Sequence, residues 1–247
     1  IALCEDKIIK IAADKDVLFN AANDPQLIAS NKVLGQSQPF EGEYGISKNP
    51  ESFASESYRG YFVDKQRGAV LRLSKDGLTP ISQAGMGDWF SDRLRDSYIN
   101  EDNNIVSENY LRILGTYDTN KKDYNVTLDS GDDTTSHTVT FSEDVRGWTS
   151  FKSFIPESGL SVAGDYYTFK QGKLFKHHIN ATRNVFYNQT AVDSFITAVI
   201  NDQPTTVKNF NAMNYSGTPG WTCDISTDLQ QGTISNFIEK EGKHFNY

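Results

Sequence analysis

The pair His177-His178 is the most obvious place in the sequence for a metal ion, because imidazole nitrogens are common ligands of Zn²⁺. The pair follows the apolar run Leu174-Phe175, which predicts a strand. Neighbouring side chains on a strand point to opposite faces, so the two imidazoles are not expected to share one ion. His137 and His244 occur in unrelated parts of the sequence. We therefore expect no metal site.

Acidic residues number 32, enough to suggest a glycosidase pair, in which two carboxylates act as acid and base. The densest group, Asp129, Asp132 and Asp133, lies in a polar stretch where such side chains typically cap a turn. This stretch lacks the alternating ligands and closing Glu of an EF-hand, so a solvated turn is favoured over a calcium loop. No Gly-x-Ser-x-Gly, phosphate loop or dinucleotide fingerprint occurs. We predict no catalytic residues, no enzyme activity and no cofactor.

The segment from Ser142 to Thr149 is faintly similar to the sialidase Asp-box, a Ser-x-Asp-x-Gly-x-Thr-Trp turn on propeller hairpins. Its spacing differs by one residue, and Trp148 precedes Thr149 instead of following it. Asp-boxes are structural turns, so the match favours a hairpin more than a hydrolase. A sialidase would also need an arginine cluster and a Tyr/Glu nucleophile pair, which the sequence does not identify.

Four aromatic residues, Trp148, Trp221, Tyr166 and Tyr167, would make a sugar-stacking face if they pointed outward. Alternating aromatic positions in hairpins more often belong to a core, which is the interpretation we favour. The two cysteines, Cys4 and Cys223, lie at opposite ends of the sequence and are expected to be unpaired thiols.

The chain has 247 residues and a formal net charge of −8, with a pI near 5.0. Nucleic-acid binders concentrate Lys and Arg, which are scattered here, so any contact with DNA is expected to be that of a passive wall. No apolar run approaches the ~18 residues of a membrane span. The chain begins with Ile1 inside a predicted strand, so we expect it to be part of a longer polypeptide.

Strand-turn-strand units recur along the sequence, with polar turns between β-branched or aromatic runs, which are the signals of hairpins. Six are predicted: 2–4 with 8–11, 61–63 with 69–73, 113–117 with 124–128, 138–141 with 148–151, 166–169 with 174–178, and 195–200 with 206–210. From Tyr117 onward they follow one another about every 25 residues, so two make a unit near the length of a four-stranded propeller blade. The predicted fold is mainly β, with serial antiparallel hairpins forming a β-propeller-like domain; a sandwich or barrel is the alternative.

One short helix is predicted near residues 86–97, where Met86, Phe90 and Leu94 share a face and Asp88 is placed to cap the start. A second, weaker helix is predicted over Asp14–Phe19. Polar loops are expected over 20–32, 35–57, 100–104 and 129–136. Residues 1–247 are treated as one β-rich region, with a weak division near 100–108, because no Pro-rich or Gly/Ser-rich linker divides the chain.

Several long phrases resemble large structural proteins of tailed bacteriophages, including marine cyanophages and crAss-like phages. They are Ser47–Ala54, Tyr61–Asp64, Arg67–Ser82, Gly147–Ser158 and Tyr167–His178, and the resemblance extends from about Leu3 to Tyr215. It implies a nozzle-like or muzzle-like tail or neck subunit of a virion, assembled as a ring around the DNA channel, and no catalytic residues. Within these phrases, Gly68 and Gly147 are expected to permit tight turns. Trp148, Phe151 and Phe154 are expected to fill a sheet interface.

Three hypotheses follow. The first is a structural tail or neck subunit, a homo-oligomer that docks other tail subunits and contacts DNA only passively. The second is a receptor-binding or polysaccharide-degrading tail module, with an acidic cleft beside exposed Trp or Tyr. The third, a cellular secreted propeller enzyme, is the weakest because it leaves the phage resemblance unexplained.

Overall fold

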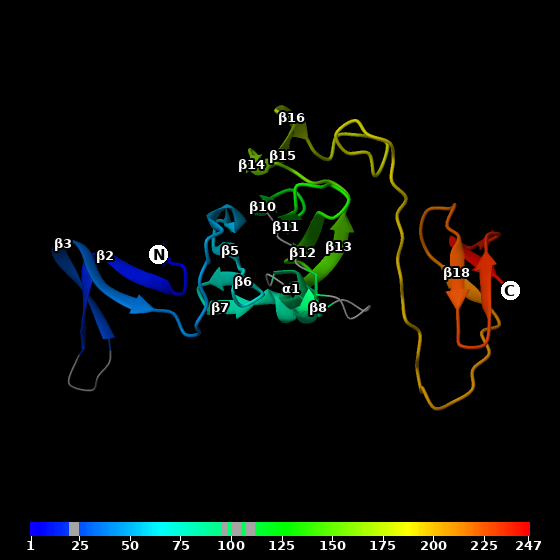
Figure 1. Cartoon of the computed structure of the whole chain (residues 1–247), viewed down its shortest axis with the longest axis horizontal. Helices are drawn as coiled ribbons and strands as arrows, with labels where there is room; N and C mark the ends of the chain where they lie inside the picture. The colour runs from blue at the N-terminus through cyan, green and yellow to red at the C-terminus, as the bar shows by residue number, and fades with distance from the viewer. Residues whose placement is uncertain (20–24, 95–97, 100–104, 107–111) are drawn as a thin grey trace. The chain divides into compact units, whose positions relative to one another are not determined.

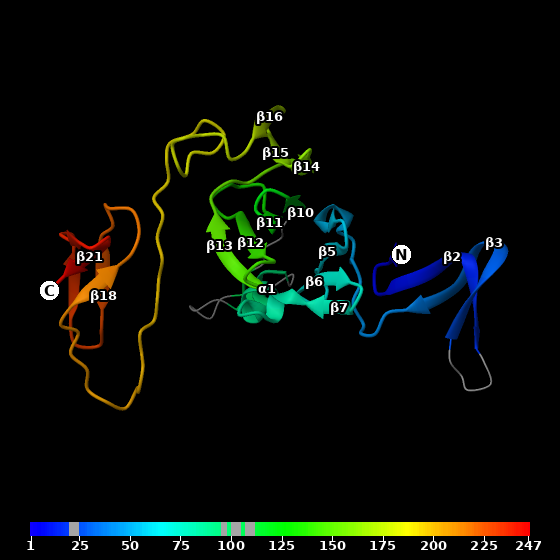
Figure 2. The ribbon, with the colours of Figure 1, turned by 180° about the vertical axis from the view of Figure 1, so that it is seen from behind.

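A computed structural model of the chain describes residues 1–19, 25–94, 98, 99, 105, 106 and 112–247. The fold is mainly β, built from antiparallel sheets with one α-helix, as expected (Figure 1). Contacts divide the chain into two units, Ile1–Ser194 and Phe195–Tyr247. Figure 2 shows the same ribbon from behind. No described helix is both long and apolar enough to cross a membrane.

The first sheet of unit 1 has the order β1-β2-β3, with bounds Ala2–Leu3, Ile8–Phe19 and Pro25–Pro39. The predicted hairpin near the start is confirmed, since Leu3 pairs with Ile8. The weaker helix predicted over Asp14–Phe19 is wrong, because these residues belong to β2 and pair with β3. A six-residue helix is marginal in water, whereas the hairpin satisfies the backbone of both strands. The loops predicted over 20–32 and 35–57 are also wrong in part, because residues 25–32 and 35–39 belong to β3. Residues 20–24 lie outside the described part.

Three further sheets follow, each a meander in which sequential strands pair antiparallel. The first meander comprises β4 (Ala54–Glu56), β5 (Arg59–Asp64), β6 (Ala69–Ser74) and β7 (Gly77–Pro80). The middle meander comprises β10 (Arg112–Asp118), β11 (Asp123–Asp129), β12 (His137–Ser142) and β13 (Gly147–Lys152). The third meander comprises β14 (Ser158–Val162), β15 (Asp165–Lys170) and β16 (Lys173–Lys176). The second to fifth predicted hairpins are confirmed as β5–β6, β10–β11, β12–β13 and β15–β16.

The helix predicted near 86–97 is confirmed as α1 (Gly87–Leu94), and residues 95–97 lie outside the described part. Phe90 and Leu94 are fully buried, Met86 packs beside them, and Asp88 lies in the first turn. The short element η1 (Pro50–Ser52) precedes β4. The helix α1 is preceded by η2 (Ile81–Gln83) and followed by two short strands, β8 (Tyr98–Ile99) and β9 (Ile105–Val106). The weak division expected near 100–108 falls mostly on residues that are not described.

The main core lies between the first and middle meanders. Alternate residues of each strand point into it because side chains on a strand alternate between faces. Ile113 and Tyr117 of β10 meet Tyr61 and Val63 of β5 in this cluster, and α1 closes one side. The opposite face of the first meander packs a second cluster that includes Ile8, Ile46, Phe62, Leu71 and Leu73. Both faces of β5 and β6 are therefore buried.

Gly115, in the middle of β10, permits a close approach of backbone to backbone. A Cβ at this position would lie 1.8 Å from the carbonyl oxygen of Ser52, in η1. The same oxygen accepts a hydrogen bond from the Tyr124 hydroxyl, 2.7 Å away. Any residue larger than glycine at 115 must therefore displace η1 from the sheet.

Of the two glycines expected to permit tight turns, only Gly68 does so. Gly68 has φ +63 in the β5–β6 turn, as expected. The expectation for Gly147 is wrong, because the left-handed residue of the β12–β13 turn is Arg146, with φ +53. A Cβ on Gly147 would have no atom nearer than 3.9 Å.

Unit 2 contains two small sheets, of order β17-β21-β20 and β18-β19. Their strands are β17 (Met213–Tyr215), β18 (Cys223–Ser226), β19 (Gln231–Ile234), β20 (Ile238–Lys240) and β21 (Lys243–Asn246), none of which the sequence patterns predicted. The sixth predicted hairpin is wrong, because residues 195–200 and 206–210 form no strand. A two-stranded hairpin with no sheet to pack on is only marginally stable in water. Sequence propensity alone was therefore insufficient here.

We predict that Gly115→Ala lowers the free energy of unfolding of unit 1 by at least about 2 kcal/mol, because overpacking a fixed backbone contact is costly. Gly147→Ala is the matched control, since it adds the same methyl group at the start of β13, in the same sheet, where the nearest atom would be 3.9 Å away. Thermal and urea unfolding followed by near-UV circular dichroism would measure both. Equal stability of the two variants would contradict the close approach of η1.

Candidate functional site

The second face of the middle meander is polar and yet buried. Six polar residues on this face are at most 2% exposed: Thr116, Asp118, Asn125, Thr127, Thr138 and Thr140. Alternating apolar and polar residues typically indicate a sheet with one solvated face. Here the third meander covers that face, since β14 and β15 both contact β10. The buried polar groups must therefore find hydrogen-bond partners inside the protein.

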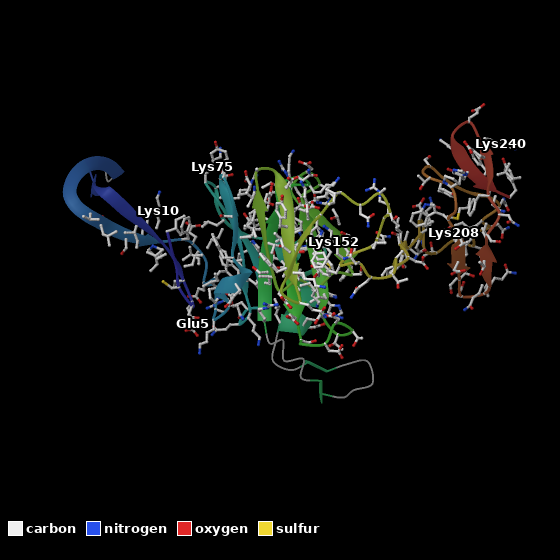
Figure 3. All side chains as sticks on the ribbon, turned by 90° about the horizontal axis from the view of Figure 1, so that it is seen from above. Glu5, Lys10, Lys75, Lys152, Lys208 and Lys240 are labelled. Carbon is white, nitrogen blue, oxygen red and sulfur yellow. The ribbon has the colours of Figure 1, made fainter. Side chains whose placement is uncertain are left out.

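These partners form a network centred on Asn125. Its side-chain oxygen accepts hydrogen bonds from the Thr140 hydroxyl at 2.7 Å and from Lys152 Nζ at 3.1 Å. Lys152 Nζ also lies 3.7 Å from a carboxylate oxygen of Asp123. Burial lowers the pKa of Lys152 and raises the pKa of Asp123, and their mutual attraction opposes both shifts. Lys152 is labelled among the side chains of this sheet in Figure 3.

His177 and His178 follow β16 and have separate partners. His177 Nε2 lies 2.7 Å from the Thr168 hydroxyl, and His178 Nε2 lies 2.6 Å from a carboxylate oxygen of Asp118. The ring centroids are 6.1 Å apart, and His178 has φ +66, outside strand geometry. Burial, with a smaller contribution from His178, lowers the pKa of His177 to about 4. These contacts give both imidazoles a structural role.

Metal ligands are not gathered elsewhere in the described part of the chain either, where no three His, Cys, Asp or Glu side chains come close enough to hold an ion. Cys4 and Cys223 are both free thiols, as expected. His137 lies beside Trp89, with ring centroids 5.8 Å apart, and His244 stacks on Tyr215 at 4.6 Å.

The Asp-box-like turn contributes Glu143 to a cluster that sequence reasoning missed. Glu143 Oε1 accepts a 2.6 Å hydrogen bond from the Tyr61 hydroxyl and lies 2.8 Å from Arg72 Nε. Arg59 Nε lies 3.5 Å from the other carboxylate oxygen. Tyr61 and Glu143 are 82 residues apart in sequence, so no local motif signals the contact.

The Glu143 cluster holds the residue types that a sialidase would need, a Tyr/Glu pair and two arginines, but not in a usable arrangement. Tyr61 is completely buried, and its ring stacks on Tyr124 at 4.8 Å. Burial, and then the hydrogen bond to Glu143, raises the pKa of Tyr61, whereas a nucleophile needs its pKa lowered or a base beside it. Both arginines are paired with Glu143, and Arg59 is also paired with Glu56 at 3.2 Å. The cluster therefore fastens the first meander to the middle one.

The acidic stretch 129–136 is a turn capped by its own side chains, as predicted. Asp129 accepts a hydrogen bond from the Gly131 amide, and Asp132 accepts one from the Thr134 amide, both at 2.9 Å. Asp133 pairs with Lys170 at 2.8 Å. All three carboxylates thus have structural partners.

Of the four aromatic residues considered for a sugar-binding face, the three that belong to unit 1 do not form one exposed face. Trp148 lies in the core, where its indole N–H donates to the Ile81 carbonyl at 2.9 Å. Tyr166 is buried on the opposite face of the middle meander, bonded to Thr116. Trp221 belongs to unit 2.

Of the three aromatic residues expected at a sheet interface, Trp148 and Phe154 are there, whereas Phe151 is 58% exposed because β13 is an edge strand.

An open groove of about 600 Å³ lies between the loop near Tyr44, the β5–β6 turn and α1. Its one arginine, Arg67, is already held by Asp64 at 3.1 Å and by Asp6 at 3.6 Å. With its cation neutralised in this way, the groove does not point to a particular ligand.

The most unusual surface of the described chain is the stretch 195–210, here called the apolar segment. Six of its large apolar side chains are 55% to 97% exposed: Phe195, Ile196, Val199, Ile200, Val207 and Phe210. Figure 1 shows this part as coil in yellow to orange. A turn forms between the two predicted strands at 203–206, where the Gln203 carbonyl accepts a hydrogen bond from the Thr206 amide at 3.1 Å, but the flanking runs do not pair. Exposed apolar stretches of this kind mark sites of protein contact.

Unit 2 as a whole also lacks a core. Among residues 195–247, His244 alone is buried. A region of this size that buries so little surface is not expected to be stable by itself. Its strands and the apolar segment therefore leave most of their surface exposed.

No protein-family model matches this chain, and no curated protein is similar enough in sequence to match it.

We predict that Lys152→Met lowers the free energy of unfolding by on the order of 2 kcal/mol, because removing one partner of a buried pair leaves the other unpaired. Lys122→Met is the control, since the ion pair of Lys122 with Asp144 is exposed on both sides and such pairs contribute little. Urea unfolding at pH 7 would compare the two. Similar losses in both variants would show that the Asn125 network contributes no more than the surface pair.

We also predict an acid-sensitive stability that depends on His177. As the pH falls below 6.5 the unfolded chain binds a proton at this residue, whereas the folded chain does so only near pH 4, so stability is lost across that window. The decrease in melting temperature from pH 7 to pH 4.5 should be smaller in His177→Gln than in the wild type or in His137→Gln. An unchanged decrease in His177→Gln would contradict the assignment.

Proposed function

We propose that this chain is a structural component of a bacteriophage virion, a nozzle-like tail or neck subunit that forms part of an oligomeric ring or wall around the DNA channel. The observation that carries the proposal is unit 2, where residues 195–247 bury one residue and expose the apolar segment. Such a surface suits a subunit that is completed by its neighbours. The phrases similar to tailed-phage structural proteins, from about Leu3 to Tyr215, supply the setting.

We further propose that the three meanders are successive blades of a propeller-like wall. In a propeller the first strand of each blade faces the axis, so the first strands of adjacent blades are neighbours. In support, β10 contacts β4 on one side and β14 on the other. The starts of β10 and β14 are 46 residues apart, near the length of one blade. A sandwich of two sheets would leave the other face of the middle meander uncovered, whereas here the third meander contacts it through β14 and β15.

The physical properties of the chain fit a passive wall. The first and middle meanders are packed on both faces, so they form a rigid body that presents loops and edges to other subunits. The net charge of −8 disfavours adhesion of DNA, which would slide past such a surface. The work assigned to the chain is therefore docking and support, without turnover.

A receptor-binding or polysaccharide-degrading tail module is the second candidate, favoured by one observation. Phe151 is 58% exposed and meets Trp89 edge to face at 5.5 Å, and Arg93 lies 4.5 Å over the Trp89 ring. Trp89 is half-buried against the main core, so the exposed Phe151 ring is the part of the pair that could stack on a sugar. If this candidate is correct, Phe151→Ala should weaken binding to host polysaccharide.

Mass spectrometry of purified virions, combined with cryo-electron microscopy, would test the main proposal. We expect peptides of this chain in multiple copies per particle, located at the tail or neck. Counting copies against the major capsid protein provides the internal standard. Absence from virions, or location at fibre tips only, would reject the wall and favour the polysaccharide-binding candidate.

A further inference from the structure

Lys152 and Asn125 come together from strands that are not neighbours. In the middle meander β12 lies between β11 and β13, and the Lys152 side chain crosses it to place Nζ 3.1 Å from Oδ1 of Asn125. The Cγ atom of Asn125 is bonded to that oxygen at about 1.2 Å, so a small rotation of the lysine side chain brings Nζ to the carbon. Holding two groups in this way replaces a bimolecular encounter with a step inside one molecule.

Asp123 lies beside the lysine on the same face of the sheet. It is two residues before Asn125 on β11, so both side chains point to one side, and its carboxylate oxygen is 3.7 Å from Lys152 Nζ. Burial lowers the pKa of Lys152 and raises the pKa of Asp123, so it favours a neutral amine beside a protonated carboxyl group. A neutral amine is a nucleophile, whereas an ammonium ion is not.

The surroundings of the Asn125 carboxamide suit an attack on its carbon. The Thr140 hydroxyl donates a 2.7 Å hydrogen bond to Oδ1, the atom on which negative charge would develop. On the other side of the carboxamide, Nδ2 lies 3.5 Å from the Tyr166 hydroxyl. Asn125, Thr140 and Tyr166 are at most 1% exposed, so bulk water is kept from competing with the amine.

We infer that Lys152 and Asn125 form an isopeptide bond within the folded chain. Nζ forms a bond to Cγ, and the bond from Cγ to Nδ2 breaks. Starting as an ammonium group, Nζ loses two protons, one before the attack and one after it. Nδ2 gains two protons and leaves as an ammonium ion, so atoms and charge balance without any other reactant. Asp123 relays the protons from Nζ to Nδ2.

Asn125 is a better acceptor for the amine than Asp123, the other carbonyl group nearby. Its oxygen is closer to Nζ, at 3.1 Å against 3.7 Å, and it already accepts the hydrogen bond from Thr140. A bond to Asp123 would also consume the group that relays the protons. The two acceptors differ in what they release, since Asn125 expels ammonia and Asp123 would expel water.

The bond would lock the middle meander covalently. Lys152 and Asn125 are 27 residues apart, and the closed loop would hold β12 between the two joined strands. A crosslink that closes such a loop restricts the unfolded chain and so stabilises the folded one. The inference goes beyond the proposed function and applies whether or not the chain belongs to a virion.

Intact mass spectrometry of the purified, denatured full chain tests the inference. We expect a mass about 17 Da below the mass of the sequence, because one ammonia is lost. Trypsin does not cleave after a modified lysine, so tandem mass spectrometry of the digest should find residues 123–146 joined to residues 147–170 through Lys152. Lys152→Met should restore the full mass, whereas Lys122→Met, which removes an exposed lysine, should keep the loss.

Three results would overturn the inference. One is a wild-type chain at the unmodified mass of its sequence. Another is a loss of about 18 Da, the mass of water, with Asp123 in the branched peptide, which would assign the bond to that residue. The third is a loss of about 17 Da that persists in Lys152→Met, because an asparagine that cyclises on its own backbone also releases ammonia.

The role of Asp123 is tested separately. Asp123→Ala keeps both reacting groups and should slow bond formation at least about 10-fold, because a positioned acid–base group is lost. Asp129→Ala removes a carboxylate at the other end of β11 and should form the bond at the wild-type rate. Near-UV circular dichroism would compare the folding of the two variants. Equal rates would overturn the proton relay by Asp123.

Discussion

The burial of the middle meander on both of its faces is the constraint on which the rest of unit 1 depends. Its apolar face meets the first meander and α1, and its polar face meets the third meander. A sheet with no solvated side fixes the positions of three other elements at once. The approach of η1 over Gly115 is possible because nothing larger than hydrogen stands at the centre of β10.

The two faces stabilise the fold by different physics. The apolar face contributes burial, which is strong but tolerates small shifts of one surface over another. The polar face contributes hydrogen bonds with fixed geometry, and a misaligned third meander would break the buried 2.8 Å hydrogen bond between the hydroxyl groups of Thr116 and Tyr166. We infer that the apolar face supplies most of the stability and the polar face fixes the register between meanders. The Glu143 cluster adds a similar fixed contact between the first and middle meanders.

The sequence predicted what is local and missed what is distant. Five of the six predicted hairpins are confirmed, because in each a turn and two β-prone runs lie within about 15 residues of one another. The contact of Tyr61 with Glu143 spans 82 residues and comes from packing, so no spacing rule could find it. The alternation of apolar and polar residues in β10 and β11 could not show that a third sheet would cover the polar face. The long pairing of β2 with β3 was missed because Lys15 and Asp16 are poor strand formers whose backbone is nevertheless paired across the hairpin.

The failure of the sixth hairpin is the most informative of these differences. Residues 195–200 and 206–210 have the composition and the turn of a hairpin, and the turn forms, yet the strands do not. Strand propensity is largely a measure of packing against neighbours, so a β-prone run without a neighbour stays unpaired. The same reasoning applies to the rest of unit 2, whose strands bury His244 and no other residue. The apolar residues of this part of the chain are therefore left exposed by the packing that the described structure provides.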